Sequence, residues 1–358
     1  MNSLRVVSLT PPRISPEHVK QKIVCIRGHR ERQFLIAMDQ REDKLIFHNY
    51  GQGGAGWTFL FGSVERSIKQ FQQAIVSSSA VGKDQPVVVI GAGCYGLLTA
   101  ITLARAGRNV RILARETSGL PSDNAAGFFF SRVRKRATPE EQELFESVGM
   151  ESYALYQQII QGVHPFIKQG PQIVPAYYGL DIDPGFAPYV AHGLMQKPEQ
   201  VIIDFGNGTQ HRAMEYHTVF VNPSEIMAEL RRLIRELNIL IISASITDFN
   251  EIPERIIFNC AGLGARDLTD DQTVIPVQGH LITLKDQPPT QELQYMINVK
   301  VLTTDLDGLP RYELIYYAPK DEGILGISFL RGRKAYMNND HEFDRILQRS
   351  QQYFKHAA

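Results

Sequence analysis

Two glycine-rich stretches are the parts of this sequence whose residue types and spacing favour ligand binding. In the first, "VVVIGAGCYG" from Val87, Gly91, Gly93 and Gly96 stand between a short β-branched run and the helical pattern "LLTAITLARAG". The first glycine permits a tight turn, the second lets a pyrophosphate approach the backbone, and the third lets helix and strand pack closely. Because a helix N-terminus also offers unpaired N–H groups, this stretch predicts a dinucleotide site. The alternative is a packing turn without a ligand.

The second stretch, "HNYGQGGAGW" at residues 48–57, holds four glycines and the single tryptophan of the chain. It runs into "TFLFGSVERSIKQ", so it also precedes a helix N-terminus, with its unpaired N–H groups and partial positive charge. Reduction of a flavin places negative charge near N1 and the C2 carbonyl, which such a helix start can stabilise. The alternative is an ordinary turn before a helix.

Hydrophobic periodicity predicts the elements that position these stretches. After Gly107, which ends the first helix, "NVRILAR" is a second strand, with Glu116 beyond it at the offset expected of a strand–helix–strand dinucleotide unit. "PSEIMAELRRLIRELN" predicts an amphipathic helix with Ser224 as its N-cap. "ILIISA" and "RIIFNCAGLGA" are further strands, and "NGT" is a hairpin turn between "QVIIDF" and "TQHRAMEY". "HLITLKD", "ELIYYAP" and "GILGISFL" predict a separate, more antiparallel sheet before a terminal helix.

Length and composition limit the class of protein. The length of 358 residues predicts two domains. Because 38 basic residues balance 38 acidic ones, the net charge gives no indication of binding to nucleic acid or to an anionic membrane. The three cysteines and the histidines have no spacing typical of a metal site, so we expect no metal. The N-terminus lacks the apolar run of a signal peptide, and the apolar stretch 87–106 is broken by glycines and polar residues. We therefore expect a cytoplasmic protein without a membrane span.

Several blocks of the sequence together carry a family resemblance. "VVVIGAGCYGLLTAITLARAG", "PSDNAAGFFFS", "IIFNCAGLGARDL", "PVQGHLITL" and "YELIYYAPKDEGILGISF" resemble successive blocks of the D-amino-acid oxidase family, in the order of that family. The stretches similar to the family's last two blocks, "CIRGHRERQF" and "HNYGQGGAGWT", stand instead at residues 25–34 and 48–58. The resemblance therefore implies a circularly permuted chain, in which about 75 N-terminal residues occupy the place of the family's C-terminal segment.

The resemblance also implies an α/β fold, with a Rossmann-type FAD-binding domain and a β-rich, mixed or antiparallel substrate domain. The expected division is 1–80 for the permuted segment, 86–170 with 222–272 for the FAD domain, 171–221 with 273–340 for the substrate domain, and 341–358 for a terminal helix. The linker is expected in "VSSSAVGKDQ" at residues 76–85.

Site residues carry over position by position. Arg27 matches the arginine that binds the substrate carboxylate in the family, and a planar guanidinium is suited to bidentate binding of a carboxylate. Arg30 is the alternative candidate for this role. Tyr312 and Tyr316 match a substrate-side pair, and at spacing four in a strand they point the same way, with Tyr317 opposite. The residues that the resemblance assigns to FAD are Gly53, Gly54, Ala55, Gly56, Trp57, Thr58, Gly91, Ala92, Gly93, Gly96, Arg115, Glu116, Asn124, Ala125, Ala126 and Gly127.

Four positions depart from the family pattern. Gly28 replaces the proline that usually follows the arginine. Arg115 stands where an acid usually binds the adenosine ribose, so either Glu116, one residue on, or Arg115 itself meets that ribose. Gln278 and His280 stand where arginine and glutamine are more usual.

The resemblance implies FAD-dependent oxidation of an amino acid or related small amine. Hydride passes from the α-carbon to the flavin, the imine hydrolyses to a keto acid, and oxygen or another acceptor takes the electrons. One alternative is an NADP-dependent reductase, in which Arg115 meets a 2′-phosphate. Another is an inactive flavoprotein-like binding protein. The substrate side chain, its stereochemistry and the oligomeric state stay open, with a homodimer as one option.

Overall fold

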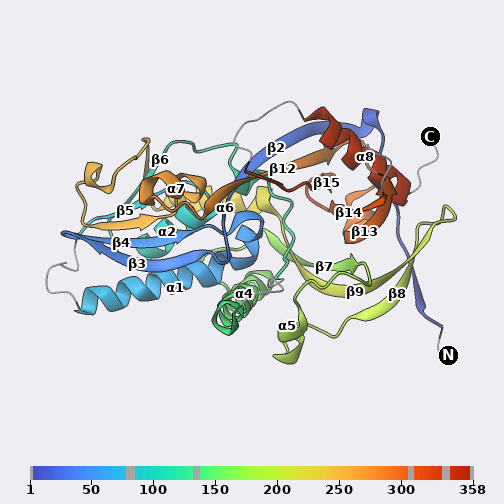
Figure 1. Ribbon diagram of the computed structural model, residues 1–358. Helices are drawn as coiled ribbons and strands as arrows, with labels where there is room; N and C mark the ends of the chain where they lie inside the picture. The colour runs from blue at the N-terminus through green and yellow to red at the C-terminus, as the bar shows by residue number, and fades with distance from the viewer. Residues whose placement is uncertain (1–2, 78–84, 132–137, 305–309, 333–338, 355–358) are drawn as a thin grey trace.

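The computed structural model describes residues 3–77, 85–131, 138–304, 310–332 and 339–354, which build two sheets lying side by side (Figure 1). The smaller sheet has six strands in the order β10-β6-β5-β11-β4-β3. All of its pairs are parallel except β3 with β4. Its strands are β3 (Leu35–Arg41), β4 (Lys44–Tyr50), β5 (Val87–Ile90), β6 (Val110–Ala114), β10 (Leu240–Ser243) and β11 (Ile256–Asn259).

Central strands of this sheet are short apolar runs because helices cover them. All four residues of β5 and of β11 are buried, as expected for parallel strands enclosed on both faces. The helices around the sheet are α1 (Gly56–Ser77), α2 (Cys94–Arg105), α4 (Pro139–Ile160), α6 (Pro223–Glu236) and the short α3 (Pro121–Asn124) and α7 (Ala265–Thr269).

The larger sheet has ten strands, in the order β1-β8-β9-β7-β13-β14-β15-β12-β16, with β2 paired to β12 beside that path. Its strands are β1 (Arg5–Ser8), β2 (Val19–Arg30), β7 (Pro171–Tyr178), β8 (Glu199–Asp204), β9 (Gln210–Val221), β12 (Val274–Leu284), β13 (Met296–Thr304), β14 (Pro310–Ala318), β15 (Ile324–Gly326) and β16 (Leu330–Arg331). One face packs under α8 (Asp340–Phe354) through the buried cluster that includes Ile315, Tyr317 and Phe354. The other face shares its apolar cluster with the smaller sheet and its helices. The connections also hold α5 (Ala187–Ala191) and five 3₁₀ turns, η1 (Pro16–His18), η2 (Gly53–Ala55), η3 (Phe249–Glu251), η4 (Gly262–Gly264) and η5 (Thr290–Leu293).

The N-terminal segment contributes to both sheets. Strand β2 runs antiparallel to β12 over its whole length, whereas β4 pairs in parallel register with β11, for example His48 with Asn259. The chain then passes through α1 and returns to the centre of the smaller sheet at β5. At the other end of the molecule, Gln351 of α8 donates a hydrogen bond of 3.0 Å to the carbonyl of Ile14. The last described turns of the chain therefore touch the N-terminal segment, while Ala358 itself lies outside the described residues.

The expected α/β fold is confirmed, and so are most local elements. The hairpin over "NGT" forms between β8 and β9, and Gly107 takes the left-handed φ of 80° just after α2. The expected N-cap at Ser224 is wrong: Asn222 caps α6, because its side chain accepts the Ser224 N–H and Pro223 fills the first helical position.

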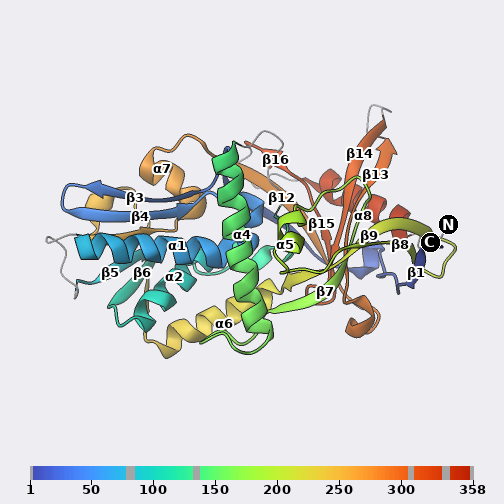
Figure 2. The same cartoon turned by 90° about the horizontal axis from the view of Figure 1, so that it is seen from below.

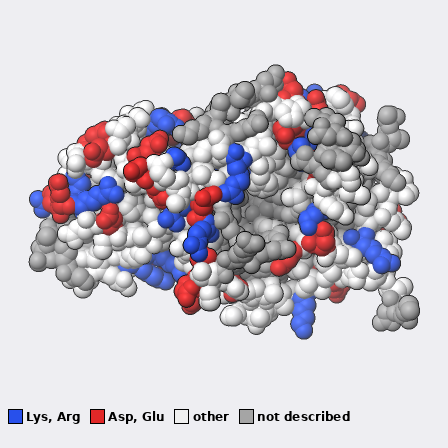
Figure 3. All heavy atoms as spheres, in the orientation of Figure 1, with Lys and Arg blue, Asp and Glu red and all other residues white. Residues whose placement is uncertain are grey.

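In the described ranges, no helix is long and apolar enough to cross a membrane. On the face shown in Figure 3, acidic and basic side chains are interspersed.

Candidate active site

The first glycine turn joins β5 to α2, and two of its glycines are required by packing. Gly91 has a φ of 105°, and a Cβ there would collide with the carbonyl of Cys260. A Cβ on Gly96 would likewise strike the carbonyl of Gly91. Gly93 differs, since a Cβ there would meet only the Ser122 hydroxyl, at 3.3 Å. At Gly93 the N-terminus of α2 is therefore bordered by a side chain and not by backbone, and this is the side from which an anion would approach the helix start.

Ala92, between these glycines, is buried. The N–H of Cys94 donates to Ser122 Oγ at 3.1 Å, which fixes α3 in front of the same helix start.

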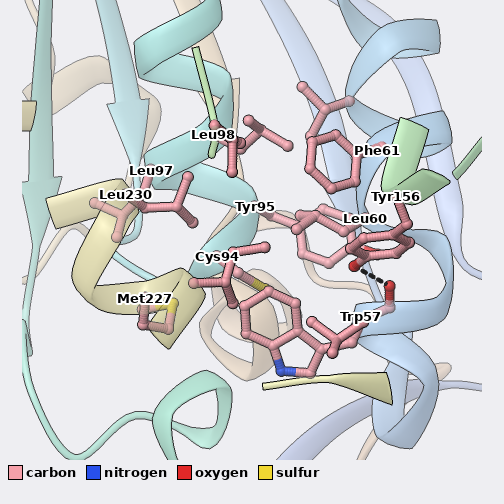
Figure 4. Close-up of a cluster of buried hydrophobic side chains, with 14 of the residues drawn as sticks. Trp57, Leu60, Phe61, Cys94, Tyr95, Leu97, Leu98, Tyr156, Met227 and Leu230 are labelled. Atoms are coloured by element: carbon pink, nitrogen blue, oxygen red, sulfur yellow. Dashed lines mark hydrogen bonds between the residues drawn. The ribbon is translucent and has the colours of Figure 1, made fainter. Parts of the chain in front are cut away.

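The second glycine turn joins β4 to α1 on the other side of β11. Two tyrosine hydroxyls hold its end: Tyr95 donates to the carbonyl of Gly56 at 2.8 Å and Tyr156 to that of Trp57 at 2.6 Å. Figure 4 shows the Trp57 indole beside Cys94, with Met227 of α6 nearby. Its Nε1 is buried and has no hydrogen-bond partner among the described residues. The two helix starts are thus tied together at one edge of the parallel sheet.

Segment 124–127, expected along the flavin, lies between the two sheets. Gly127 is a packing glycine, because a Cβ at its φ of 84° would strike the carbonyl of Val221. The Thr58 hydroxyl of α1 accepts the Phe130 N–H at 3.0 Å, which ties this segment to the second turn. Asn124 donates to the carbonyl of Gly119 at 3.2 Å, while Ala125 is half-buried and Ala126 buried.

Arg115 and Glu116 follow the carboxyl end of β6 and form an exposed ion pair, 3.3 Å between Nε and Oε1. Both side chains are free enough to turn toward a ribose there, so the choice between them stays open. Together with Gly53, Gly54 and Ala55 in η2, they complete the placement of the residues assigned to FAD.

Arg27 projects from β2 toward the second glycine turn. A Cβ on Gly54 would lie 3.0 Å from its Nη1, and a Cβ on Gly279 would collide with its Nη2. The guanidinium carbon lies 5.1 Å from the ring centre of Phe329, and Nη2 makes a long contact of 3.4 Å with the carbonyl of Ser328. Nε is buried without a partner, and none of the ion pairs between described residues involves Arg27. Arg27 is half-buried, and a partly desolvated cation without an acidic partner among the described residues is suited to binding an anion.

Arg30, its rival, has a structural role. Its Nε pairs with Asp271 at 2.8 Å, and an Nη donates to the carbonyl of Gln33. Although burial opposes the shift, hydrogen bonds from Thr273 and Arg30 lower the pKa of Asp271 to about 2. The Tyr50 hydroxyl also donates to this carboxylate. Arg30 is therefore occupied in joining β2 to the strand before the second turn.

The departure at Gly28 has a packing reason. A Cβ at this position would lie 2.6 Å from the backbone nitrogen of Leu263 in η4, so the usual proline would not fit. Gln278 and His280, the two departures in β12, point away from Arg27. Gln278 accepts from Asn339 at 3.0 Å, and the His280 ring lies edge-on to Phe343 of α8, with Nδ1 at 2.5 Å from Ser328 Oγ.

The two matched tyrosines occupy different surroundings. Tyr316 lies against Phe128, with ring centres 3.9 Å apart, and burial raises its pKa well above the ordinary value while the Arg27 charge acts in the opposite direction. Tyr312 is 71% exposed near the outer end of β14. Tyr317 faces the opposite side, in the core under α8. The structure thus brings Tyr316 close to Arg27 and leaves Tyr312 at the surface, so a substrate role for Tyr312 stays a prediction.

Two residues that sequence reasoning missed share the surface of Tyr316. Asn298 pairs directly with Tyr316 in β14, and on its other side with Tyr178 in β7. Paired residues project from the same face of a sheet. The only local signal is a polar residue within the apolar strand "MINVKV", which does not reveal its neighbours.

Comparisons with known proteins agree with this geometry. Residues 86–358 match the family model DAO, described as FAD dependent oxidoreductase, so the chain belongs to this family. A D-amino-acid oxidase from Streptomyces coelicolor is 28% identical over 204 residues, which is 57% of this chain and 60% of that protein. This chain therefore spans about 60% of the length of that curated relative.

Solved structures show the same fold. A glycine oxidase from Bacillus cereus ATCC 14579 has a TM-score of 0.55 at 16% identity, over 75% of this chain and 77% of that one. An iminodiacetate oxidase from Chelativorans sp. BNC1 has a TM-score of 0.50 at 13% identity, over 75% of this chain and 79% of that one.

FAD is the cofactor of this family, and the residues present fit it. The helix start at Gly93 faces a side chain and no backbone, which suits a pyrophosphate, and beside the second turn the buried Nε1 of Trp57 and Nε of Arg27 have no hydrogen-bond partner among the described residues. Membership of a family described as FAD dependent oxidoreductase favours FAD over the nicotinamide cofactor of the NADP-dependent alternative. Within the part of the chain that the structure describes, no group of three or more His, Cys, Asp or Glu could hold a metal ion.

Proposed function

We propose that this protein oxidises a small amino acid, or a related amine, whose carboxylate is held by Arg27. The observation that carries the proposal is the half-buried Arg27, whose guanidinium lies between Gly54 of the second turn and Gly279 of β12 and whose buried Nε has no hydrogen-bond partner among the described residues. The relatives support the same class, since their names are those of oxidases of D-amino acids, glycine and iminodiacetate.

The residues of this chain bind and orient the substrate. Arg27 offers a planar fork that matches a carboxylate, and its contact with Phe329 limits how the fork can rotate. Tyr316 borders the same region from β14, and the start of α1 brings N–H groups toward negative charge on the cofactor. When bound, FAD would supply the hydride acceptor, with oxygen or another compound as the final electron acceptor. The carbon to be oxidised is placed by these contacts, and placement alone contributes strongly to rate.

We also propose that the chain is circularly permuted relative to its family. The family match begins at residue 86, yet β4 lies parallel to β11 within the same sheet as β5 and β6. Residues 1–80 then complete the FAD domain with β3, β4 and α1, and the substrate domain with β1 and β2. The remaining division follows the two sheets, with 86–170 and 222–272 around FAD, and 171–221 and 273–340 around the substrate.

Two measurements test the proposed activity. The purified protein should show a flavin absorbance spectrum, and a panel of amino acids in both enantiomers should include members that bleach it without oxygen. Peroxide release in air would identify oxygen as the acceptor. A yellow protein that no amino acid or small amine reduces would contradict the proposal and favour the inactive binding protein.

A further inference from the structure

A row of polar side chains crosses the larger sheet next to the proposed carboxylate site. Tyr178 of β7, Asn298 of β13 and Tyr316 of β14 are directly paired, so all three project from one face. This face is the one turned toward the smaller sheet, because Tyr178 belongs to the apolar cluster shared with α1, α2 and α6. Its opposite face carries Tyr177, Ile297 and Tyr317 under α8.

Two polar atoms of this row are buried and unsatisfied. The Tyr178 hydroxyl and Asn298 Oδ1 have no hydrogen-bond partner among the described residues, although Tyr178 is fully buried and Asn298 is only 6% exposed. Such groups are rare in folded proteins because each costs the desolvation of a polar atom. A hydroxyl that can donate or accept, next to a carbonyl that only accepts, fits a ligand with a polar N–H or O–H group.

The place of these atoms indicates which part of the substrate they meet. From β2, which carries Arg27, the strand order runs β12, β15, β14, β13 and β7. Because neighbouring strands lie about 4.8 Å apart, Asn298 is one strand beyond Tyr316, and Tyr178 two strands beyond, on the side away from Arg27. The amino group, one carbon from the carboxylate, stays near Arg27. The side chain of the substrate is what extends along the row.

The surroundings favour an uncharged group at that end. The rings nearest Tyr178 are Phe130, Phe186 and Tyr216, with centres 6.2, 5.9 and 5.5 Å away. These rings offer no charge to pair with an ion, and an unpaired ion at a buried site is costly.

We infer that Tyr178 and Asn298 are specificity-determining residues that bind a neutral hydrogen-bonding group, an amide or a hydroxyl, on the substrate side chain. This inference rests on the proposed function, because Arg27 fixes the other end of the substrate. It predicts that amino acids with such side chains are preferred over hydrocarbon or thioether analogues of similar shape.

The test compares matched substrates with the FAD-loaded protein. Asparagine should have a kcat/KM at least about tenfold above that of leucine, and glutamine above that of methionine, in the enantiomer that reacts. The double variant Tyr178→Phe with Asn298→Leu should abolish this preference. Because it removes unsatisfied polar atoms without changing side-chain shape much, its Tm without substrate should equal or exceed that of the natural protein.

Tyr177→Phe is the matched control. This neighbour points to the opposite face, and its hydroxyl donates to Glu215 at 3.1 Å, so its loss should lower Tm and leave the substrate preference unchanged. Equal rates for asparagine and leucine, or a Tm of the double variant as low as that of the control, would overturn the inference. If no amino acid reduces the flavin, the proposed function fails instead. The inference is then decided by whether asparagine raises Tm more than leucine does.

Discussion

The two glycine turns look alike in sequence but are built on different contacts. Each follows a parallel strand of the smaller sheet and opens a helix, and the two lie on either side of β11. In the first turn, Gly91 and Gly96 are pressed against backbone carbonyls of their own domain. In the second, Gly51, Gly53 and Gly54 face side chains of β2, namely Arg30, His29 and Arg27 in that order.

This difference separates a fold requirement from a site requirement. Gly91 and Gly96 of the first turn allow strand, turn and helix to pack, and Gly93 is the glycine of this turn that faces no backbone carbonyl. Glycines of the second turn make room for three side chains that arrive from the other sheet. The contacts of the first turn therefore stay within the smaller sheet, between residues 87–107 and Cys260 of the turn after β11, whereas the second turn depends on the N-terminal segment that joins both sheets.

Removing the N-terminal segment is expected to have the largest effect. A chain of residues 86–358 lacks β3, β4 and α1 of the smaller sheet and β2 of the larger, so it should not retain FAD after gel filtration. Residues 86–358 followed by a short glycine–serine linker and residues 1–77 should recover the flavin absorbance, because Gln351 already contacts Ile14. Flavin retained by the shortened chain, or absent from the rearranged one, would refute the permutation.

The sequence predicted the first turn well because its determinants are local. Strand, glycine spacing and helix all lie within about twenty residues, and periodicity is sufficient to recognise them. The second turn was recognised only through a family resemblance, since its pairing with β11 links residues more than 200 positions apart.

Long-range pairing also explains what was missed or left open. The choice between Arg27 and Arg30 depends on Asp271, which is 241 positions from Arg30 and carries no motif that connects them. Asn298 and Tyr178 meet through the β7–β13 pair, which is equally invisible in a local pattern. Sequence patterns predict elements, whereas these contacts depend on which strands become neighbours.

Substitutions of the two arginines of β2 test which of them binds the substrate beside the second turn. Arg27→Ala should keep the flavin spectrum but raise the KM for amino-acid substrates at least about tenfold, because charge-assisted hydrogen bonds to a carboxylate contribute roughly 1.5–3 kcal/mol. Arg27→Lys should have a KM between those of the natural protein and of Arg27→Ala, since a point charge cannot bind two carboxylate oxygens in one plane. Anaerobic flavin reduction against substrate concentration measures both.

Arg30→Ala is the control on the same strand. It breaks the ion pair with Asp271 and should lower Tm, with a much smaller change in KM than at Arg27. The assignment is wrong if Arg27→Ala reduces its flavin normally or if Arg30→Ala has the larger KM.

The smallest expected effect distinguishes the turns by pH. His48 lies on β4 just before the second turn, 5% exposed, with Nδ1 at 3.2 Å from the Asn259 amide nitrogen. Burial lowers the pKa of His48 to about 4, while Asp39 opposes the shift. The four residues of β5, before the first turn, include no titratable side chain.

Because the pKa of His48 is lower in the folded state than its ordinary value of about 6.5, the unfolded chain takes up the proton first as the pH falls. The stability that neutral His48 contributes is complete above about pH 6.5 and is lost progressively toward pH 4, by at most about 1.4 kcal/mol per pH unit. His164, whose pKa burial also lowers to about 4, acts in the same window through its own site between α4 and β7. His48→Gln should therefore lower Tm at pH 7.5, but its Tm should fall less steeply between pH 6.5 and 4 than that of the natural protein. His164→Gln should likewise reduce the fall of Tm over this range. Thermal unfolding of the natural protein, His48→Gln and His164→Gln across this range measures how steeply Tm depends on pH. An unchanged pH dependence of Tm in His48→Gln would show that the second turn is not the more acid-sensitive of the two.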